Sequence, residues 1–449
     1  MKNIKRRFLQ FSFYDRTGIE RYLEKQALKG WRLCKIKGPV WYFERIEPQR
    51  LHFAVTYLPA ASTYDPEPTE AQRQLEAFCM HAGWQQAAYN GEMQIFYHAG
   101  ENPVPIETDA LMEIENIHRA MKKSYLPSMF LLMFVGVMQM AMFISDWIKS
   151  PIRVLTETAT QFRGLMALIL LLITSVEIGG YFLWRRRAIK SAERDGSFIK
   201  TRGHQRFQWT MLFFAIALLI FMLTTLESSA TGLMVFAILY VLLIFALVQG
   251  VTAYLKKKKV SGEVNKTLTI MAAVILSMVM IGILPFLGLS SIFPNRKPEN
   301  THVEAPLLPS DYFDVEPTEY DIDLNAAHSP LLKRSTYYVS PVPISCESPG
   351  VVYVIYDTKF DWAYDICLNQ LLTDRQERSD QIDRAHMESY RLIDAQDFAA
   401  QSVYCQYWGE QPVVNGAYIV CYEDRIVLLR AGTELTGAQM KLIGEKIKP

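Results

Sequence analysis

The sequence predicts a multi-domain membrane protein, in which a bundle of five transmembrane helices separates an N-terminal α+β domain from a C-terminal α+β domain. Five apolar segments, each close to the roughly 20 residues that a helix needs to cross a bilayer, follow one another in the middle of the 449-residue chain. The loops between them differ strongly in positive charge, and the polar regions on either side have the patterns of folded domains. The predicted domains are 1–110, 111–290 and 291–449, with a linker over 291–330.

The N-terminal region is expected to follow the order strand, helix, strand, strand, helix, strand. Thr17 and Thr69 each begin a Ser/Thr-x-x-Glu/Gln capping box, which predicts two helix starts. Both helices end at a Gly-Trp pair that a strand follows, so the two halves match in outline. This split repeat predicts a ferredoxin-like βαββαβ domain, with two helices on one face of a four-stranded sheet. The strand patterns cover residues 8–14, 40–43, 52–57 and 95–97.

The same region carries a family resemblance. Phe13-Tyr14-Asp15 leads into Gly18-Ile19-Glu20, and the matching elements after it are Leu23-Glu24, Lys29-Gly30-Trp31-Arg32-Leu33, Tyr42-Phe43 and Tyr57. In these residues the first quarter of the chain resembles the DUF2812 proteins of Firmicutes and related bacteria. The resemblance implies a cytosolic module ahead of transmembrane helices, in proteins often encoded near PadR-like regulators. It implies no enzymatic activity and no catalytic residue.

The five apolar segments are predicted to be the transmembrane helices. They cover residues 125–144, 165–184, 209–226, 232–254 and 268–287. Lysine and arginine resist translocation, so loops rich in them stay in the cytoplasm. Eight such residues lie between the second and third segments and five between the fourth and fifth, whereas the turn between the third and fourth has none. We therefore expect a multi-pass protein of the bacterial plasma membrane, with its N-terminus in the cytoplasm and its C-terminus outside.

Glu177 is an acidic residue well inside an apolar segment. An ionisable group at that depth is costly unless it faces a partner or water. One interpretation is a coupling or ion-pathway group, with Gln139 and Gln249 as its candidate partners. The other is a hydrogen-bonded helix contact, helped by the close approach that Gly179 and Gly180 allow.

Two basic clusters follow the second and fourth segments. Each cation contributes about 1 kcal/mol near an anionic membrane surface, so these clusters are candidates for binding lipid headgroups. Their other interpretation is that they only set the orientation of the chain. The residues are Arg185, Arg186, Arg187, Lys256, Lys257, Lys258 and Lys259.

The C-terminal region is expected to fold as a second α/β module. Because this region is acidic, we expect it not to attract anionic lipid or nucleic acid. Strand patterns cover 336–339, 351–356, 418–422 and 425–429, a helix is expected over 362–372, and Thr436 begins a capping box before a last helix. Four cysteines of this region can form disulfides outside the cell or remain buried thiols, and three pairings are open. They are Cys346, Cys367, Cys405 and Cys421.

No motif for a catalytic or nucleotide-binding site is present. The chain has no Gly-x-x-x-x-Gly-Lys-Ser/Thr loop, no Gly-x-Ser-x-Gly elbow and no His-Glu-x-x-His pair, so we expect no enzyme, no metal and no cofactor. The layout favours a sensor or adaptor that couples an external module to a cytosolic module, with the lipid bilayer and a regulator or transporter subunit as partners. The alternative is a small transporter or an accessory subunit of one, with Glu177 as its coupling group.

Overall fold

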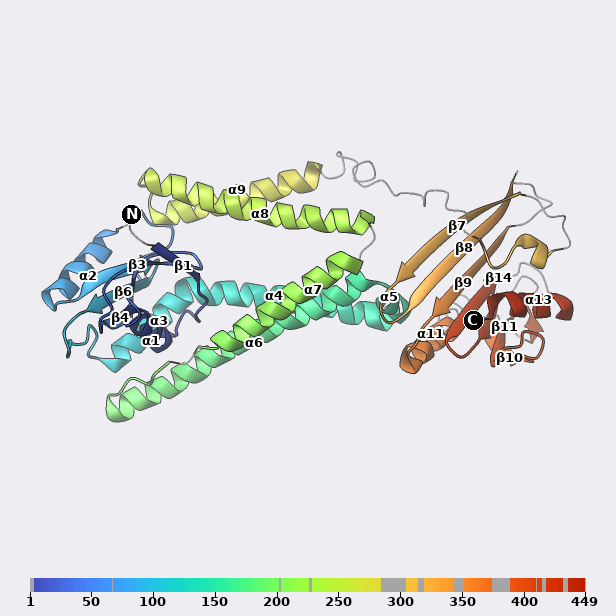
Figure 1. The fold of residues 1–449 in the computed structure, drawn as a ribbon, viewed down its shortest axis with the longest axis horizontal. Coiled ribbons are helices and arrows are strands. Elements are labelled where there is room, and N and C mark those ends of the chain that lie inside the picture. The colour runs from blue at the N-terminus through green and yellow to red at the C-terminus, as the bar shows by residue number, and fades with distance from the viewer. Residues whose placement is uncertain are drawn as a thin grey trace. The chain divides into compact units, whose positions relative to one another are not determined.

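The computed structural model describes residues 4–66, 68–201, 203–225, 228–283, 304–313, 319–342, 350–373, 388–408, 410–413, 417–430 and 435–448. The chain divides into two compact units. Unit 1 contains Met1–Met138, Met166–Ile220 and Ser228–Pro294, and unit 2 contains Gln139–Leu165, Phe221–Glu227 and Asn295–Pro449. Figure 1 shows the elements in order along the chain.

The N-terminal domain consists of two βαββ halves rather than one sandwich. The first half contains β1 (Ile4–Phe8), α1 (Arg16–Ala27), β2 (Trp31–Lys37) and β3 (Val40–Arg45), and the second contains β4 (His52–Tyr57), α2 (Glu70–His81), β5 (Gln85–Asn90) and β6 (Met93–His98). They form two three-stranded antiparallel sheets of the orders β1-β3-β2 and β4-β6-β5. For these described strands, the prediction of one four-stranded ferredoxin-like sheet is wrong.

The two halves agree in detail. Each second strand has an irregularity in its pairing, between Leu33 and Lys35 in β2 and between Gln86 and Ala88 in β5. Glycines in the left-handed conformation follow both helices, with φ of +76° at Gly30 and +83° at Gly83. The Gly-Trp pairs that suggested a repeat therefore mark equivalent turns, which only glycine adopts without strain.

Two local predictions in this domain are wrong. Residues 8–14 were expected to form a strand, but β1 ends at Phe8 and most of the apolar run lies in the loop that leads to α1. The N-cap of α1 is Asp15, whose side chain accepts a hydrogen bond from the Gly18 backbone N–H, and not Thr17. The capping box of α2, Thr69 with Gln72, is confirmed.

The core of the N-terminal domain extends into two long helices. Leu23, Phe43 and Ile95 are buried together with Ile117 of α3 (Ala110–Ala120) and with residues of α6 (Thr158–Asp195). The α6 residues include Tyr181 and Trp184, in the last turns of the predicted segment 165–184. This end of the segment is therefore apolar because it packs in a domain core.

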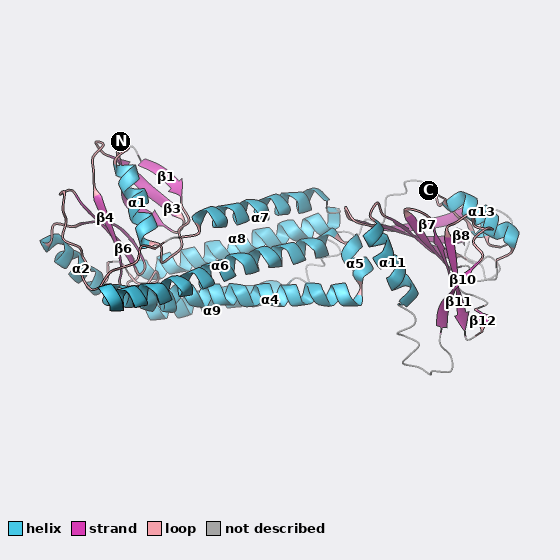
Figure 2. Cartoon of the chain, turned by 90° about the horizontal axis from the view of Figure 1, so that it is seen from below, coloured by secondary structure: helices cyan, strands magenta, loops and turns pink. Residues whose placement is uncertain are grey.

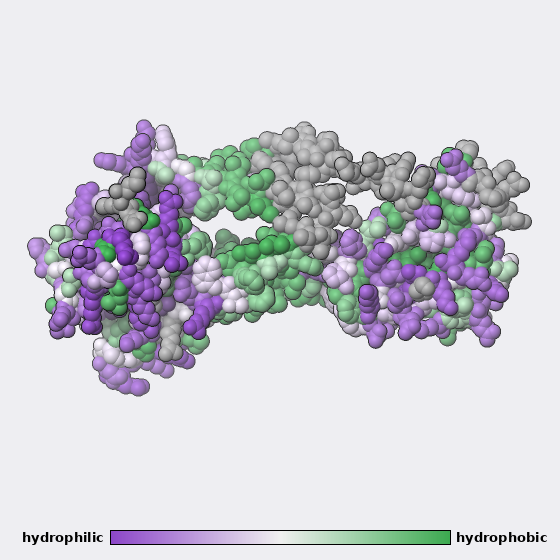
Figure 3. Space-filling view, viewed as in Figure 1, coloured by the Kyte–Doolittle hydropathy of each residue, from purple (hydrophilic) through white to green (hydrophobic). Residues whose placement is uncertain are grey.

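Five helices are long and apolar enough to cross a membrane. α3 continues through a π-helical turn, Met121–Tyr125, into α4 (Leu126–Lys149), and the other four are α6, α7 (Gln205–Thr225), α8 (Ser228–Lys257) and α9 (Gly262–Ile283). Large apolar side chains on them are exposed, such as Phe134 at 62% and Met278 at 68%, as expected of lipid-facing surface. Figure 3 shows hydrophobic residues gathered over these helices. Each predicted segment falls within or overlaps one of them; residues 226 and 284–287 lie outside the described part.

The C-terminal domain is an antiparallel sheet covered on both faces. Its strand order is β10-β11-β13-β14-β9-β8-β7, and β12 pairs with β11. α13 (Gly437–Ile447) and the 3₁₀ turn Pro309–Asp311 pack on one face, and α11 (Asp361–Thr373) packs with α5 (Pro151–Thr156) on the other (Figure 2). The strands are β7 (Glu319–His328), β8 (Lys333–Val342), β9 (Val351–Asp357), β10 (Glu388–Ile393), β11 (Ser402–Trp408), β12 (Gln411–Pro412), β13 (Ala417–Cys421) and β14 (Arg425–Arg430).

Most elements predicted for this domain are confirmed, including the helix over 362–372 and the capping box at Thr436. The linker expected over 291–330 is not supported in its described part. Leu307 and Tyr312 are buried in the domain core, and β7 already begins at Glu319.

Gly30→Ala should destabilise the first βαββ half. Its φ of +76° is left-handed, and an added Cβ would lie 2.8 Å from the carbonyl oxygen of Ile46. We expect a loss of roughly 3 kcal/mol in the free energy of local opening, measured by amide hydrogen exchange of β2 and β3 in the full-length protein. Gly38→Ala is the control, because Gly38 has φ of +55° but open space around it. It should lose only about 1 kcal/mol. Equal losses would contradict the role of the contact with Ile46.

Candidate functional site

The Glu177 carboxylate is buried and fully hydrogen-bonded. Its exposed fraction is 2%, Oε1 accepts hydrogen bonds from Ser12 Oγ at 2.9 Å and from Gln208 Nε2, and Oε2 accepts one from the Tyr125 hydroxyl at 3.3 Å. The donors come from the β1–α1 loop, from α7 and from the turn between α3 and α4. A buried charge is tolerated where such donors replace water. Glu177 therefore joins the N-terminal domain to three helical segments.

The partners predicted for Glu177 are wrong. In the described part of the chain neither Gln139 nor Gln249 hydrogen-bonds to it. Gln139 belongs to unit 2, and Gln249 of α8 lines a cavity together with residues of β2 and β5. The donors that replace them, Ser12 and Gln208, lie outside the apolar segments or at their edge, so a search for polar residues within the segments does not find them.

The first turn of α1 is attached to the connection between α6 and α7. The Thr17 backbone N–H donates to Thr201 Oγ1 at 2.9 Å, and the Thr201 backbone N–H donates to Thr17 Oγ1 at 3.1 Å. Asp15, which caps α1, lies so close to Gly203 that a Cβ on Gly203 would be 2.4 Å from its carboxylate. Thr17 thus has a role between segments, which explains why it is not the cap.

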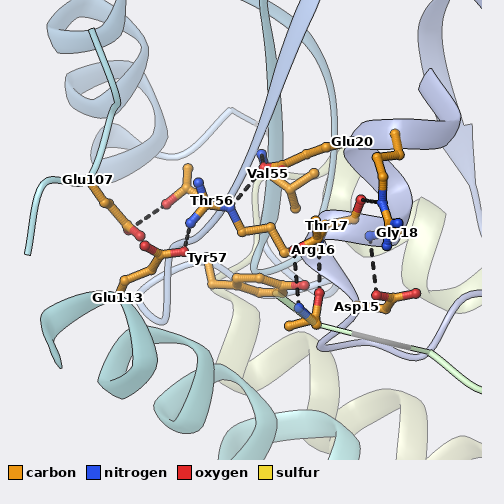
Figure 4. Close-up of polar contacts among 12 residues, drawn as sticks. Asp15, Arg16, Thr17, Gly18, Glu20, Val55, Thr56, Tyr57, Glu107 and Glu113 are labelled. Carbon is orange, nitrogen blue, oxygen red and sulfur yellow. Dashed lines mark hydrogen bonds and ion pairs between the residues drawn. The ribbon is translucent and has the colours of Figure 1, made fainter. Parts of the chain in front are cut away.

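Arg16 connects α1 with α3 and with the connection between α6 and α7 (Figure 4). Its guanidinium forms ion pairs with Glu20 at 2.8 Å and with Glu113 of α3, and it lies 5.3 Å from the ring centre of Phe198. Glu20 also accepts a hydrogen bond from the Val55 backbone N–H at 2.9 Å. Burial raises the pKa of Glu20 above its usual range, although Arg16 acts in the opposite direction.

Aromatic residues of the same loop pack on the long helices. The ring centre of Tyr14 lies 5.4 Å from that of Tyr181 and 5.5 Å from that of Trp184, both on α6. Phe13 stacks on Tyr125 with ring centres 5.6 Å apart. The run Phe13-Tyr14-Asp15 therefore makes contacts between the N-terminal domain and the long helices.

The equivalent loop of the second half, between β4 and α2, also contacts the helices. Asn265 of α9 donates through Nδ2 to the Tyr64 carbonyl oxygen at 2.7 Å. Lys123 donates through Nζ to the carbonyl oxygens of Pro59 and Ala61 at 2.9 and 3.0 Å. Both loops that join a first strand to its helix are thus attached to long helices.

Residues 15–129 match the family model described as "Protein of unknown function (DUF2812)". This region is a DUF2812 domain. The resemblance seen in the sequence is confirmed, and the matched range extends past 110 to include α3 and the first residues of α4. Searches of curated proteins and of solved structures gave no match.

In unit 2, the beginning of α6 is attached to the C-terminal domain in a similar way. The Ile152 backbone N–H donates to Gln370 Oε1 of α11 at 2.6 Å. Gln161 of α6 donates through Nε2 to Ser329 Oγ at 3.1 Å, and Thr158 Oγ1 donates to the His328 carbonyl oxygen at 3.3 Å. α6 therefore contributes its first turns to the C-terminal unit and its later turns to the unit of the DUF2812 domain.

The basic clusters are divided between two environments. Arg185 is half-buried and lies 3.9 Å from Glu115, whereas Arg186 and Arg187 are exposed. Lys257, Lys258 and Lys259 are exposed, and Lys256 is half-buried at the edge of a cavity. Headgroup binding by these residues stays a prediction.

Of the two alternatives left open for the C-terminal cysteines, the structure has buried thiols at those that it describes, Cys367, Cys405 and Cys421. Cys367 and Cys421 are thiols buried in one apolar cluster of the C-terminal domain, whereas Cys405 packs in the cluster on the opposite face of the sheet. The sheet itself therefore prevents Cys405 from pairing with either. Cys346 lies outside the described residues. Among the described residues, no group of three His, Cys, Asp or Glu side chains is placed to hold a metal ion.

Replacing Glu177 should loosen the DUF2812 domain on the helices. Glu177→Leu removes the acceptor of the buried Ser12 and Tyr125 hydroxyls and leaves Gln208 only its weaker bond to Ser12 Oγ at 3.4 Å, which costs roughly 3 kcal/mol. We expect faster amide hydrogen exchange in residues 9–17 and 203–208 of the full-length protein. Glu177→Gln keeps one acceptor oxygen and should lose less. Glu193→Leu, at an exposed position of α6, is the control. Unchanged exchange in Glu177→Leu would show that the carboxylate does not hold this contact.

Thiol reactivity should separate the cysteines. Burial raises the pKa of the Cys79 thiol to about 11 and that of the Cys367 thiol to about 12. At pH 8 only about one molecule in a thousand or fewer then carries the reactive thiolate, and this fraction rises about tenfold per pH unit. We expect a water-soluble maleimide to modify the exposed Cys34 first, as measured by peptide mass spectrometry. All cysteines should react after unfolding. Equal native rates, or a bridge to Cys367, would contradict this assignment.

Proposed function

We propose that this protein is a non-enzymatic sensor or adaptor of the bacterial plasma membrane, which couples a C-terminal module outside the cell to the DUF2812 domain in the cytoplasm. The observation that carries the proposal is the use of α6. It is one helix from Thr158 to Asp195, with hydrogen bonds to the C-terminal domain at Thr158 and Gln161 and to the DUF2812 domain at Glu177.

The charge pattern supports the orientation. The cation-rich connection that carries Arg185–187 packs with the DUF2812 domain through Phe198 and Thr201, so both belong on the side where lysine and arginine are retained. After an odd number of crossings the C-terminal domain lies on the other side. The five candidate helices fit that count.

The proposed mechanism of coupling depends on the narrow range of donor–acceptor distances over which a hydrogen bond forms. A helix that moves along its axis by one residue shifts by about 1.5 Å, which exceeds the range over which a hydrogen bond keeps its length. Binding to the C-terminal domain that favours one position of α6 would therefore change the bonds of Glu177. A ligand shifts such an equilibrium only through different affinities for its two states.

The DUF2812 domain offers surface for a cytosolic partner, such as a regulator or a transporter subunit. Phe78 and Met80 of α2 are exposed at 63% and 62%, on a helix that takes no part in the contacts around Glu177. This leaves α2 accessible while the two loops hold the long helices.

The competing proposal is a small transporter, or an accessory subunit of one, that uses Glu177 as its coupling group. Its distinguishing property is flux in proteoliposomes that Glu177→Gln abolishes. Flux of this kind would replace the sensor proposal.

The coupling role of α6 can be tested by softening the helix between its two attachments. Leu168→Gly with Leu172→Gly removes exposed side chains one turn apart and weakens the helix by about 1 kcal/mol per site. In nanodiscs, Ser329→Ala should raise hydrogen exchange in residues 9–17 several-fold, because it breaks the bond to Gln161 of α6, and the softened helix should remove this response.

The matched control softens a different helix. Ile275→Gly with Val279→Gly changes two exposed residues of α9 at the same spacing and should leave the response intact. If Ser329→Ala has no effect on residues 9–17, or the same effect in every background, α6 does not couple the two domains.

A further inference from the structure

A polar cavity of about 680 Å³ lies where the two halves of the DUF2812 domain meet α8. Strand β2 of the first half and strand β5 of the second provide most of its lining, together with the turn at Gly38 and the residues Gln249 and Lys256 of α8. Its volume is in the range of ligand-binding cavities. None of the contacts around Glu177 uses it.

The lining has the chemistry of an anion site. Lys35 and Lys37 of β2 and Lys256 of α8 provide three cations, and Gln86, Asn90 and Gln249 provide side-chain amides. No aspartate or glutamate is among the described residues that line it. Ammonium and amide N–H groups suit a phosphate group, whose oxygens only accept hydrogen bonds.

The position of the cavity indicates where the phosphate comes from. Lys256 lies in the last turn of α8, directly after the apolar stretch of a helix able to cross a membrane. At the end of such a helix, the nearest phosphates are those of the lipid headgroups. We propose that this cavity binds the phosphate group of an anionic membrane lipid, which bridges both halves of the DUF2812 domain and α8.

This proposal does not depend on signal transfer through α6. It also assigns Lys35 and Lys37 a role that the orientation of the chain in the membrane does not explain. A cation that only sets topology acts from a loop beside a membrane segment, whereas these two lie on a strand of a folded domain. Bound lipid would strengthen the attachment of the domain to α8, because one phosphate contacts residues of both.

The test compares two double substitutions that remove equal charge. Lys35→Gln with Lys37→Gln removes two lysine side chains that line the cavity. Lys257→Gln with Lys258→Gln removes two exposed lysine side chains that follow Lys256 in the sequence. Full-length protein is placed in nanodiscs of phosphatidylcholine with increasing phosphatidylglycerol, and thermal unfolding and native mass spectrometry report bound lipid. The exposed variant should need roughly 30-fold more phosphatidylglycerol for the same stabilisation, because two cations near the membrane surface are lost, and the cavity variant at least about 100-fold more, because its two cations also lose charge-assisted hydrogen bonds to the phosphate.

Further arms identify the source of the phosphate. Inorganic phosphate and glycerol 3-phosphate are added to nanodiscs of phosphatidylcholine alone, and they should not stabilise the wild type at millimolar concentration. If either compound stabilises the wild type and this stabilisation is lost in the cavity variant, the proposal of a lipid ligand is overturned and the cavity binds a soluble phosphate compound. Equal losses in the two double variants would overturn the cavity itself and leave general attraction to a charged surface.

Discussion

The structure of unit 1 depends on one requirement, which is that the carboxylate of Glu177 must be hydrogen-bonded where water is excluded. A carboxylate buried among apolar helices is costly without donors. Ser12, Tyr125 and Gln208 supply them from three separate segments. The requirement of the Glu177 carboxylate for hydrogen-bond donors therefore determines that the β1–α1 loop of the DUF2812 domain contacts α6, α7 and the turn between α3 and α4. The contacts of Tyr14, Arg16 and Thr17 follow in the same loop and the first turn of α1.

The internal repeat of two βαββ halves explains how the DUF2812 domain is attached to the long helices. Both βαββ halves place the loop after their first strand against long helices, the first at Glu177 and the second at Asn265. The seam between the halves, where β2 and β5 meet, takes no part in these contacts and lines the cavity that we propose as a lipid site. Of the residues that carry the family resemblance, Phe13, Tyr14 and Asp15 thus contact the long helices or their connection, whereas lysines of β2 line the cavity at the seam.

The sequence predicted those features that depend on local pattern. Apolar length located the five helices, alternation located strands such as β9 and β14, and capping boxes located the starts of α2 and α13. Contacts between distant segments misled the same rules. Thr17 has the pattern of a cap but pairs with Thr201, and residues 8–14 alternate like a strand because Tyr14 packs on α6. The four-stranded sheet failed because short, polar strands such as β5 carry little periodic signal.

The site was predicted by its central residue and not by its neighbours. Glu177 was found because an acid in an apolar segment is conspicuous, but Ser12 and Gln208 are ordinary polar residues near segment ends. The central claim is that Ser12 and Glu177 hold the DUF2812 domain on α6. A double-mutant cycle of Ser12→Ala and Glu177→Leu, each of which removes this hydrogen bond, tests it most directly when it is read from the hydrogen exchange of residues 13–17. We expect a coupling free energy of about 1–2 kcal/mol; effects that add within about 0.5 kcal/mol would contradict the account.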